Sequence, residues 1–142
     1  MKIRVLLICV LFLISLGSTR SYAQPVECPN AKDLLDVPVE EVNQIIGSLK
    51  VLVPTLYEVG DFPEYYSKWE LVTVKPFPLT VKNSDERDYY EMAKNFCGKE
   101  VADRSWLVRL HFPRVKAASA SQGQIFLAKK KNNGWFVWFK YH

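Results

Sequence analysis

Apolar residues recur every three to four positions between residues 39 and 53, with charged and amide side chains between them. This spacing predicts a helix with one buried face. We expect Asp36 to cap the helix and Pro38 to lie in its first turn. Pro54 is expected to end or kink the helix, because proline lacks the backbone N–H that continues it. A short helix is also predicted after Asp61, because Pro63 suits a first turn.

A second amphipathic pattern covers residues 85–97. Asn83 precedes it with the spacing to Glu86 that is typical of a capping box, and Gly98 follows it where a C-terminal glycine is favoured. The sequence therefore predicts a helix that carries Cys97 in its last turn, facing the interior.

From residue 99 onward the apolar period changes from about 3.6 to 2, which indicates strands. In the segment 101–112 one side is mostly apolar, and the other is mixed and carries Asp103, Ser105, Arg109 and His111. The last strand is apolar on both sides, so it is either buried on both faces or exposes a binding surface. Strands are expected at residues 69–75, 101–112, 124–131 and 135–141, with an edge strand or a loop at 79–82.

This order of elements predicts an α+β fold in which N-terminal helices pack on one face of a curved antiparallel sheet of three to five strands. The tripeptide Asn132-Asn133-Gly134 predicts a tight hairpin turn between the last two strands, since Asn and Gly tolerate positive φ.

Residues 1–23 have the layout of a secretory signal peptide. Lys2 and Arg4 precede an apolar run at 5–16 that only Ser15 interrupts, and small residues flank a cut before Gln24. A membrane span needs about 20 apolar residues, so an anchor is the less favoured alternative. We expect a secreted, extracytoplasmic protein in which residues 24–142 form a single domain without a membrane span.

Two cysteines remain after cleavage, Cys28 and Cys97. In an oxidising compartment two thiols most simply form one disulfide. The chain-entropy model gives about 4 kcal/mol of stabilisation for a loop of this length. The alternative, a redox-active cysteine, needs a nearby resolving thiol or a Cys-x-x-Cys pair, and the sequence has neither.

The charges of residues 24–142 nearly cancel, with 16 basic and 15 acidic side chains. The sequence therefore gives no electrostatic reason to expect nucleic acid as a partner. The charges are divided along the chain: residues 24–98 carry 7 basic and 13 acidic side chains, and residues 99–142 carry 9 and 2. Either the two halves complement each other, or the basic tip Lys129-Lys130-Lys131 attracts an anionic surface.

Residues that carry chemistry are sparse. The chain has only two histidines, His111 and His142, so we predict no metal site and no cofactor. Asp103, Ser105 and His111 would project in parallel from one strand, whereas a catalytic triad must converge. We therefore do not expect an enzyme.

The helix at 85–97 leads into Ser-Trp-Leu-Val-Arg-Leu, and the chain ends in Gln-Ile-Phe-Leu-Ala-Lys-Lys-Lys-Asn-Asn-Gly-Trp-Phe-Val-Trp-Phe. In these stretches and in element order the chain resembles secreted nuclear-transport-factor-2-like and cystatin-related cone-fold domains. The resemblance implies a pocket between the concave face of the sheet and the helices. It names no ligand, because such folds host enzymes, binders and assembly modules.

Aromatic residues are dense in the last strand and in a second stretch. In both places they either fill the core or form a surface that binds a glycan or a protein. That second stretch contains Tyr57, Phe62, Tyr65, Tyr66 and Trp69.

The favoured hypothesis is a non-catalytic domain at the cell envelope that binds a protein or a glycan through the C-terminal hairpin. Trp135, Trp138 and Lys130 would be its contact residues, which requires at least one indole to be substantially exposed.

The alternative is a small pocket enzyme or ligand binder on the concave sheet face, with Asp103, Arg109 and His111 lining one cavity and Arg109 anchoring an anion. A cystatin-type inhibitor ranks last, because Ser-Gln-Gly-Gln-Ile around Gln122 matches an exposed Gln-x-Val-x-Gly hairpin poorly.

Overall fold

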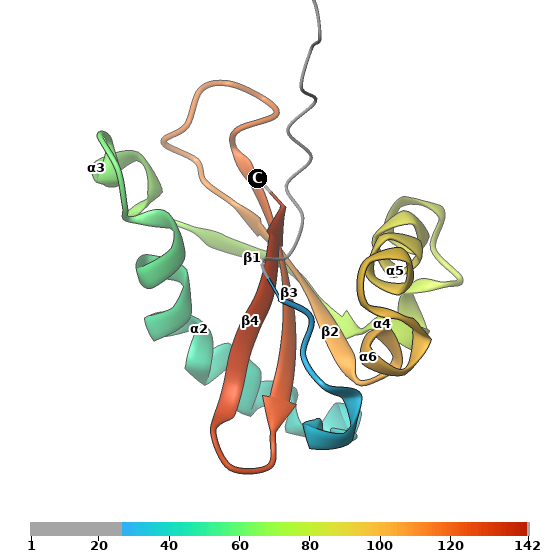
Figure 1. The fold of residues 1–142 in the computed structure, drawn as a ribbon. Helices are drawn as coiled ribbons and strands as arrows, with labels where there is room; N and C mark the ends of the chain where they lie inside the picture. Colours follow the sequence, from blue (N-terminus) through green and yellow to red (C-terminus); the bar gives the residue numbers. More distant parts are fainter. Residues whose placement is uncertain (1–26, 142) are drawn as a thin grey trace, which may run out of the picture.

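The computed structural model describes residues 27–141, so the predicted signal peptide and its cleavage before Gln24 lie outside the described residues. The strands of this part form one antiparallel sheet in the order β1-β2-β3-β4, which confirms the predicted α+β class (Figure 1). Among residues 27–141 no helix has the length and apolar character needed to cross a membrane. The strands are β1 (Glu70–Pro76), β2 (Ser105–His111), β3 (Gln122–Lys130) and β4 (Gly134–Tyr141).

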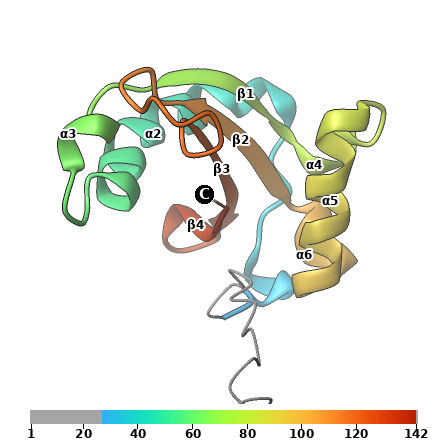
Figure 2. The same ribbon diagram turned by 90° about the horizontal axis from the view of Figure 1, so that it is seen from above.

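Helices cover both faces of the sheet, whereas the sequence had predicted helices on one face only. Figures 1 and 2 show α2 and α3 on one side of the strands and α4, α5 and α6 on the other. Successive residues of β2 confirm the division: Trp106 and Val108 join the cluster under α2, and Leu107 joins the cluster under α5. We call these surfaces the α2 face and the α5 face. The helices are α2 (Val42–Tyr57), α3 (Pro63–Tyr66), α4 (Phe77–Thr80), α5 (Ser84–Cys97) and α6 (Lys99–Asp103).

The last strand is covered on both faces because each face has its own helices. Trp138 and Phe139 are buried on the α5 face, and Trp135 and Val137 are half-buried on the α2 face. A bulge sets which residues of β4 face which side. Phe126 of β3 pairs with Phe139, and the next residue, Leu127, pairs with Val137, so Trp138 is the extra residue. The bulge turns both Trp138 and Phe139 toward the α5 face.

Helix α2 differs from the prediction at both ends. A 3-10 turn, Val39–Glu41, precedes it, with Pro38 rather than Asp36 at its start. Pro54 lies inside the helix, which continues to Tyr57 because the N–H of Glu58 donates to the Pro54 carbonyl at 2.9 Å. The missing N–H of Pro54 falls on a side of the helix where Lys50 is exposed, so water can satisfy the carbonyl left without a donor.

Helix α5 follows its prediction closely. The Asn83 side chain accepts from the N–H of Asp85 at 3.0 Å, and Gly98 ends the helix with φ of +85°. The Glu86 side chain does not close a capping box. It is buried and accepts from Lys75 Nζ at 2.7 Å and from Thr73 Oγ1 at 3.2 Å, which ties α5 to β1.

The first residues of two segments predicted as extended are helical: residues 101–103 of the strand predicted at 101–112, and residues 79–80 of the edge strand or loop predicted at 79–82. Residues 99–103 form α6, because Lys99 and Asp103 pair one turn apart and Val101 and Ala102 face the core. Residues 77–80 form α4 rather than an edge strand or loop, with Phe77 buried. The predictions for α3 and for β1 are confirmed.

The disulfide between Cys28 and Cys97 is present, with 5.4 Å between the two Cα atoms. Beyond it the N-terminal segment runs beside the tip of the β3–β4 hairpin (Figure 1). Leu34 bridges Lys130, and the N–H of Leu35 donates to the Lys129 carbonyl at 2.9 Å. The start of the described chain thus pairs with β3 beyond the point where β2 stops.

Candidate functional site

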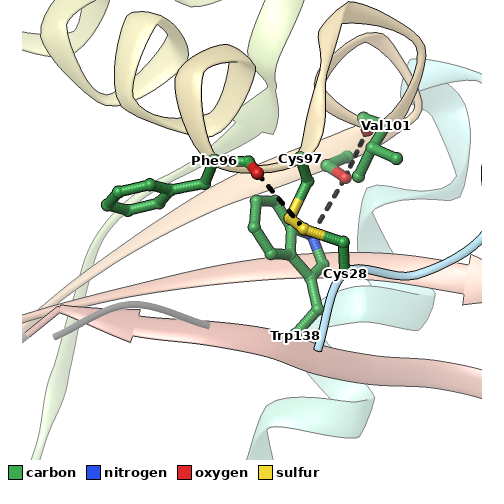
Figure 3. Close-up of a disulfide and its surroundings, with 6 residues drawn as sticks. Cys28, Phe96, Cys97, Val101 and Trp138 are labelled. Carbon is green, nitrogen blue, oxygen red and sulfur yellow. Dashed lines mark hydrogen bonds between the residues drawn. A yellow bond between two sulfur atoms is a disulfide. The ribbon is translucent and has the colours of Figure 1, made fainter. Parts of the chain in front are cut away.

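Trp138 belongs to the core and not to a binding surface. Its indole is 7% exposed, and its Nε1–H donates to Ser105 Oγ at 3.0 Å. Ser105 in turn donates to the Val101 carbonyl at 2.6 Å, so the indole is fixed by a buried chain of hydrogen bonds. Figure 3 shows Trp138 at the disulfide, where Cys28 Sγ lies 3.3 Å from the Phe96 carbonyl oxygen.

Trp135 is half-buried on the α2 face and packs edge-on against Trp106, with ring centroids 6.1 Å apart. Its Nε1 is buried without a hydrogen-bond partner in the described part of the chain. The expectation that one of the two indoles is substantially exposed is therefore wrong. The cause is that α2 and α5 each cover one side of the hairpin.

The lysines of the hairpin tip are used within the fold. Lys129 Nζ donates to Glu41 Oε2 at 2.9 Å and to Gln44 Oε1 at 3.0 Å, and Lys131 Nζ donates to the Lys32 carbonyl at 3.0 Å. Part of the charge difference between the two halves of the chain is therefore compensated within the fold, where Lys129 of the hairpin pairs with Glu41 just before α2.

Lys130 lies beside an open hollow of about 550 Å³ next to the disulfide. Its Nζ sits 4.7 Å from the centre of the Phe136 ring, which favours a cation on the ring face. Trp138 and Cys28 line the same hollow. Of the predicted hairpin contacts, Lys130 and Trp138 line this hollow.

Arg109 and His111 share a second hollow of about 160 Å³ on the sheet, with Val72, Leu110 and Gln122 as its other walls. His111 Nδ1 lies 3.4 Å from Glu70 Oε2. The parity of β2 predicted the juxtaposition of Arg109 and His111 correctly. The Gln122 contribution was missed because pairing of β3 with β2 cannot be read from one strand alone.

Asp103 does not join this hollow. It ends α6 at the opposite end of β2, where it accepts from Tyr90 Oη at 2.6 Å and pairs with Lys99. Burial alone would raise the pKa of Asp103, but the hydrogen bonds from Lys99 and Tyr90 outweigh it and lower the pKa. The predicted group of Asp103, Arg109 and His111 is therefore separated, because residues 99–103 are helical.

Exposed apolar side chains gather at the corner where α2 meets α3. Val59, Phe62 and Tyr65 are 63%, 61% and 46% exposed, and the rings of Phe62 and Tyr65 lie 5.9 Å apart. We call these three residues the aromatic shelf. Tyr65 also lines an open hollow of about 290 Å³ with Arg114, Val115, Lys116 and Ala117.

Two sets of contacts fix the shelf, one from the loop after β2 and one from the Tyr57–Tyr66 ring pair. Arg114 Nη1 donates to the Glu64 carbonyl at 3.1 Å and to Ser67 Oγ at 2.7 Å, which fixes α3 to the loop after β2. Behind it Tyr66 stacks on Tyr57, with 6.0 Å between ring centroids. Burial raises the pKa of Tyr57, and the neighbouring Tyr66 adds to this. The buried ring pair supports rings that remain open to solvent.

Within residues 27–141 no three His, Cys, Asp or Glu side chains are grouped so that they could hold a metal ion. Neither a protein-family model, nor a curated protein, nor a solved structure matches the chain. The resemblance to cone-fold domains therefore stays a prediction.

Proposed function

We propose that the protein is a secreted, non-catalytic domain that binds a glycan of the cell envelope through the aromatic shelf. The observation that carries this proposal is the pair of exposed rings, Phe62 and Tyr65, next to each other at the α2–α3 corner. The corner is fixed by the stacked Tyr57 and Tyr66 rings and by the hydrogen bond from Arg114 to Ser67. Large apolar side chains exposed together on a rigid corner favour a binding surface.

A glycan suits this shelf better than a protein. The C–H faces of sugar rings pack on aromatic faces, and two neighbouring rings with an adjacent hollow match one or two sugar units. A stable protein interface buries about 800 Å² on each partner and needs a larger apolar centre than three side chains. Arg114 and Lys116 beside Tyr65 supply hydrogen-bond donors for hydroxyl or carboxylate groups of the sugar.

The secreted location is part of the proposal. It is supported by the signal-peptide layout of residues 1–23 and by the Cys28–Cys97 disulfide, which persists in oxidising compartments.

Co-sedimentation with purified insoluble peptidoglycan tests the proposal. We expect the mature domain to sediment with the polymer, and the F62A/Y65A variant to bind at least about fivefold more weakly, since each stacked ring contributes about 0.5–1.5 kcal/mol. The matched control is L79A/V81A, which removes two exposed apolar side chains at α4 and just after it, away from the shelf.

Unchanged binding of F62A/Y65A, or an equal loss in L79A/V81A, would contradict the shelf as the site. The glycan assignment is wrong if the domain binds neither peptidoglycan nor chitin and instead forms a cross-link through Tyr65 to an envelope protein.

A further inference from the structure

The turn at the tip of the β3–β4 hairpin depends on a glycine. Residues 131–133 form the turn, and Lys130 and Gly134 are the register partners that close it. Gly134 has a φ of +72°, a backbone conformation that glycine adopts far more readily than residues with a side chain. The tight turn therefore favours a glycine directly after Asn133.

The same glycine leaves the Asn133 side chain open to attack by the backbone. The amide nitrogen of the residue after an asparagine can bond to the side-chain carbonyl carbon, Cγ, and close a cyclic imide. A side chain on that residue hinders the approach, and glycine has none. Asn133 is also exposed, so water and hydroxide reach it. The requirement of the turn and the requirement of the reaction thus coincide at Asn133.

The other asparagines of the chain are placed differently. Asn30 and Asn83 use their side-chain oxygens as caps, where they accept from the N–H of Lys32 at 3.1 Å and from the N–H of Asp85 at 3.0 Å. The rest are followed by Gln, Phe or Asn, whose side chains hinder the attack; they are Asn43, Asn95 and Asn132. Asn133 is the one asparagine of the sequence that precedes a glycine.

We propose that Asn133 is a site of spontaneous modification, at which the folded domain is converted to an aspartate form and an isoaspartate form. The deprotonated amide nitrogen of Gly134 bonds to Cγ of Asn133, and the Cγ–Nδ2 bond breaks with release of ammonia. Water then opens the cyclic imide. Opening at Cγ gives aspartate, and opening at the main-chain carbonyl gives isoaspartate, in which the backbone continues through the side-chain carbon.

Water is the co-reactant, and nothing is oxidised or reduced. The site lies on the hairpin and does not depend on the aromatic shelf, so the inference goes beyond the proposed glycan binding.

The reaction changes the hairpin tip in two ways. A carboxylate at position 133 adds a negative charge at a hollow of about 330 Å³ that Lys130, Lys131 and Asp33 also line. Isoaspartate in addition lengthens the backbone within the turn, and the length of a hairpin loop sets the register of its strands. Trp135, which follows the turn and packs edge-on against Trp106, would be displaced first. The isoaspartate form should therefore be the less stable of the two products.

Mass spectrometry of the domain after incubation at neutral and at mildly alkaline pH tests the site. Trypsin cuts after Lys131 and Lys140 and releases residues 132–140, in which the aspartate and isoaspartate forms separate by chromatography. We expect this peptide to gain the mass by which a carboxyl group exceeds an amide. The rate should rise in proportion to the hydroxide concentration. The chain unfolded in guanidinium chloride is the reference for an unrestrained Asn-Gly pair, and the folded domain should be converted within the same incubation.

Two matched variants assign the reaction to Asn133. N133Q keeps an amide at the tip, but its longer side chain closes the ring less readily, so the peptide should keep its mass. N132Q changes the neighbouring asparagine and leaves the Asn133-Gly134 pair intact, so it should be converted like the unmodified domain.

N133D separates the effect of charge from the effect of backbone length, because it carries the carboxylate without the longer backbone. We expect the isolated isoaspartate form to have a lower thermal unfolding midpoint than N133D.

The proposal is overturned if the folded domain keeps Asn133 through an incubation that converts the unfolded chain, since the turn would then hold the Gly134 nitrogen away from Cγ. Conversion of N133Q at the rate of the unmodified domain, or conversion at Asn132 in place of Asn133, would also overturn it. Equal midpoints of the isoaspartate form and N133D would contradict the predicted change of register.

Discussion

The two aromatic stretches of this chain have similar density in the sequence, but exposed rings occur in the stretch 57–69 and not in the hairpin. In the hairpin, Trp138 and Phe139 are 7% and 4% exposed, whereas Phe62 and Tyr65 are 61% and 46% exposed. The difference arises from topology: β4 lies between α2 and α5, and the α2–α3 corner lies outside the sheet (Figure 2). Aromatic content alone therefore does not locate a binding surface.

The hairpin rings form one continuous packing arrangement. Phe139 lies 5.0 Å from both Phe96 and Phe126 between ring centroids, and Trp138 lies 5.3 Å from Phe126. On the shelf, Phe62 has Tyr65 as its ring neighbour in the described residues. The comparison predicts that substitutions in the hairpin act on stability and substitutions on the shelf act on binding.

Replacing Trp138 by Ala should have the largest effect, a loss of about 4 kcal/mol in the free energy of unfolding, because it leaves a cavity under α5 and removes the hydrogen bond to Ser105. Y65A should change the same quantity by no more than about 0.5 kcal/mol. Urea denaturation followed by circular dichroism measures both. Equal losses would mean that the two stretches are buried alike.

The double variant C28S/C97S should lower the free energy of unfolding by about 3 kcal/mol, because the loop between the two residues is released in the unfolded chain. The shelf lies away from the disulfide, so peptidoglycan binding of the folded variant should remain. The same denaturation and co-sedimentation assays check the two halves of this statement. If the folded double variant no longer binds peptidoglycan, the disulfide region and the shelf are coupled, which contradicts their separation.

Gly123 links the sheet to the base of the shelf. A Cβ at this position would lie 2.5 Å from the Tyr57 hydroxyl oxygen and 2.9 Å from Phe112, so G123A should cost about 2 kcal/mol. Adding Y57F should recover part of this loss, since it removes the clashing oxygen, which also has no partner in the described chain. The thermal unfolding midpoint compares G123A and G123A/Y57F with the unmodified domain.

G47A is the control for that series, because a Cβ on Gly47 meets open space within α2. It should raise stability by about 0.5–1 kcal/mol through helix propensity. A loss in G47A, or no loss in G123A, would contradict the packing described at these positions.

The smallest expected effect is the pH dependence of Asp103, at the end of α6. Its pKa is lowered in the folded state, so its contribution is present above about pH 4 and is lost as the pH falls through the folded pKa. D103N should therefore be less stable than the unmodified domain at neutral pH, and the difference should shrink in acid. A difference that grows as the pH falls would contradict the lowered pKa.

Local signals in the sequence predicted several elements well. Helix α5 was predicted because Asn83 and Gly98 act within one turn of its ends, and α3 because Pro63 fixes its first turn. The parity of β2 brought Arg109 and His111 together, and the cysteine count predicted the disulfide. Each of these predictions depends on contacts within one helix or strand, or on the fact that only two cysteines remain after the predicted cleavage.

The predictions that were wrong depend on distant contacts. The alternating pattern of residues 99–103 is overridden by the Lys99–Asp103 pair and by Tyr90 from α5. The bulge at Trp138 shifts the parity of β4, and the cover on both faces follows from how α2 and α5 dock. The position of Gln124 opposite Arg109 can be recognised only once β2 and β3 are paired.

Hydroxyl-radical footprinting with and without peptidoglycan tests the central claim most directly, because it reads solvent exposure at each aromatic residue. We predict that Phe62 and Tyr65 are oxidised in the free domain and protected by the polymer, and that Trp138 is not oxidised in either state. Oxidation of Trp138 in the folded domain, or protection at the hairpin in place of the shelf, would contradict the account.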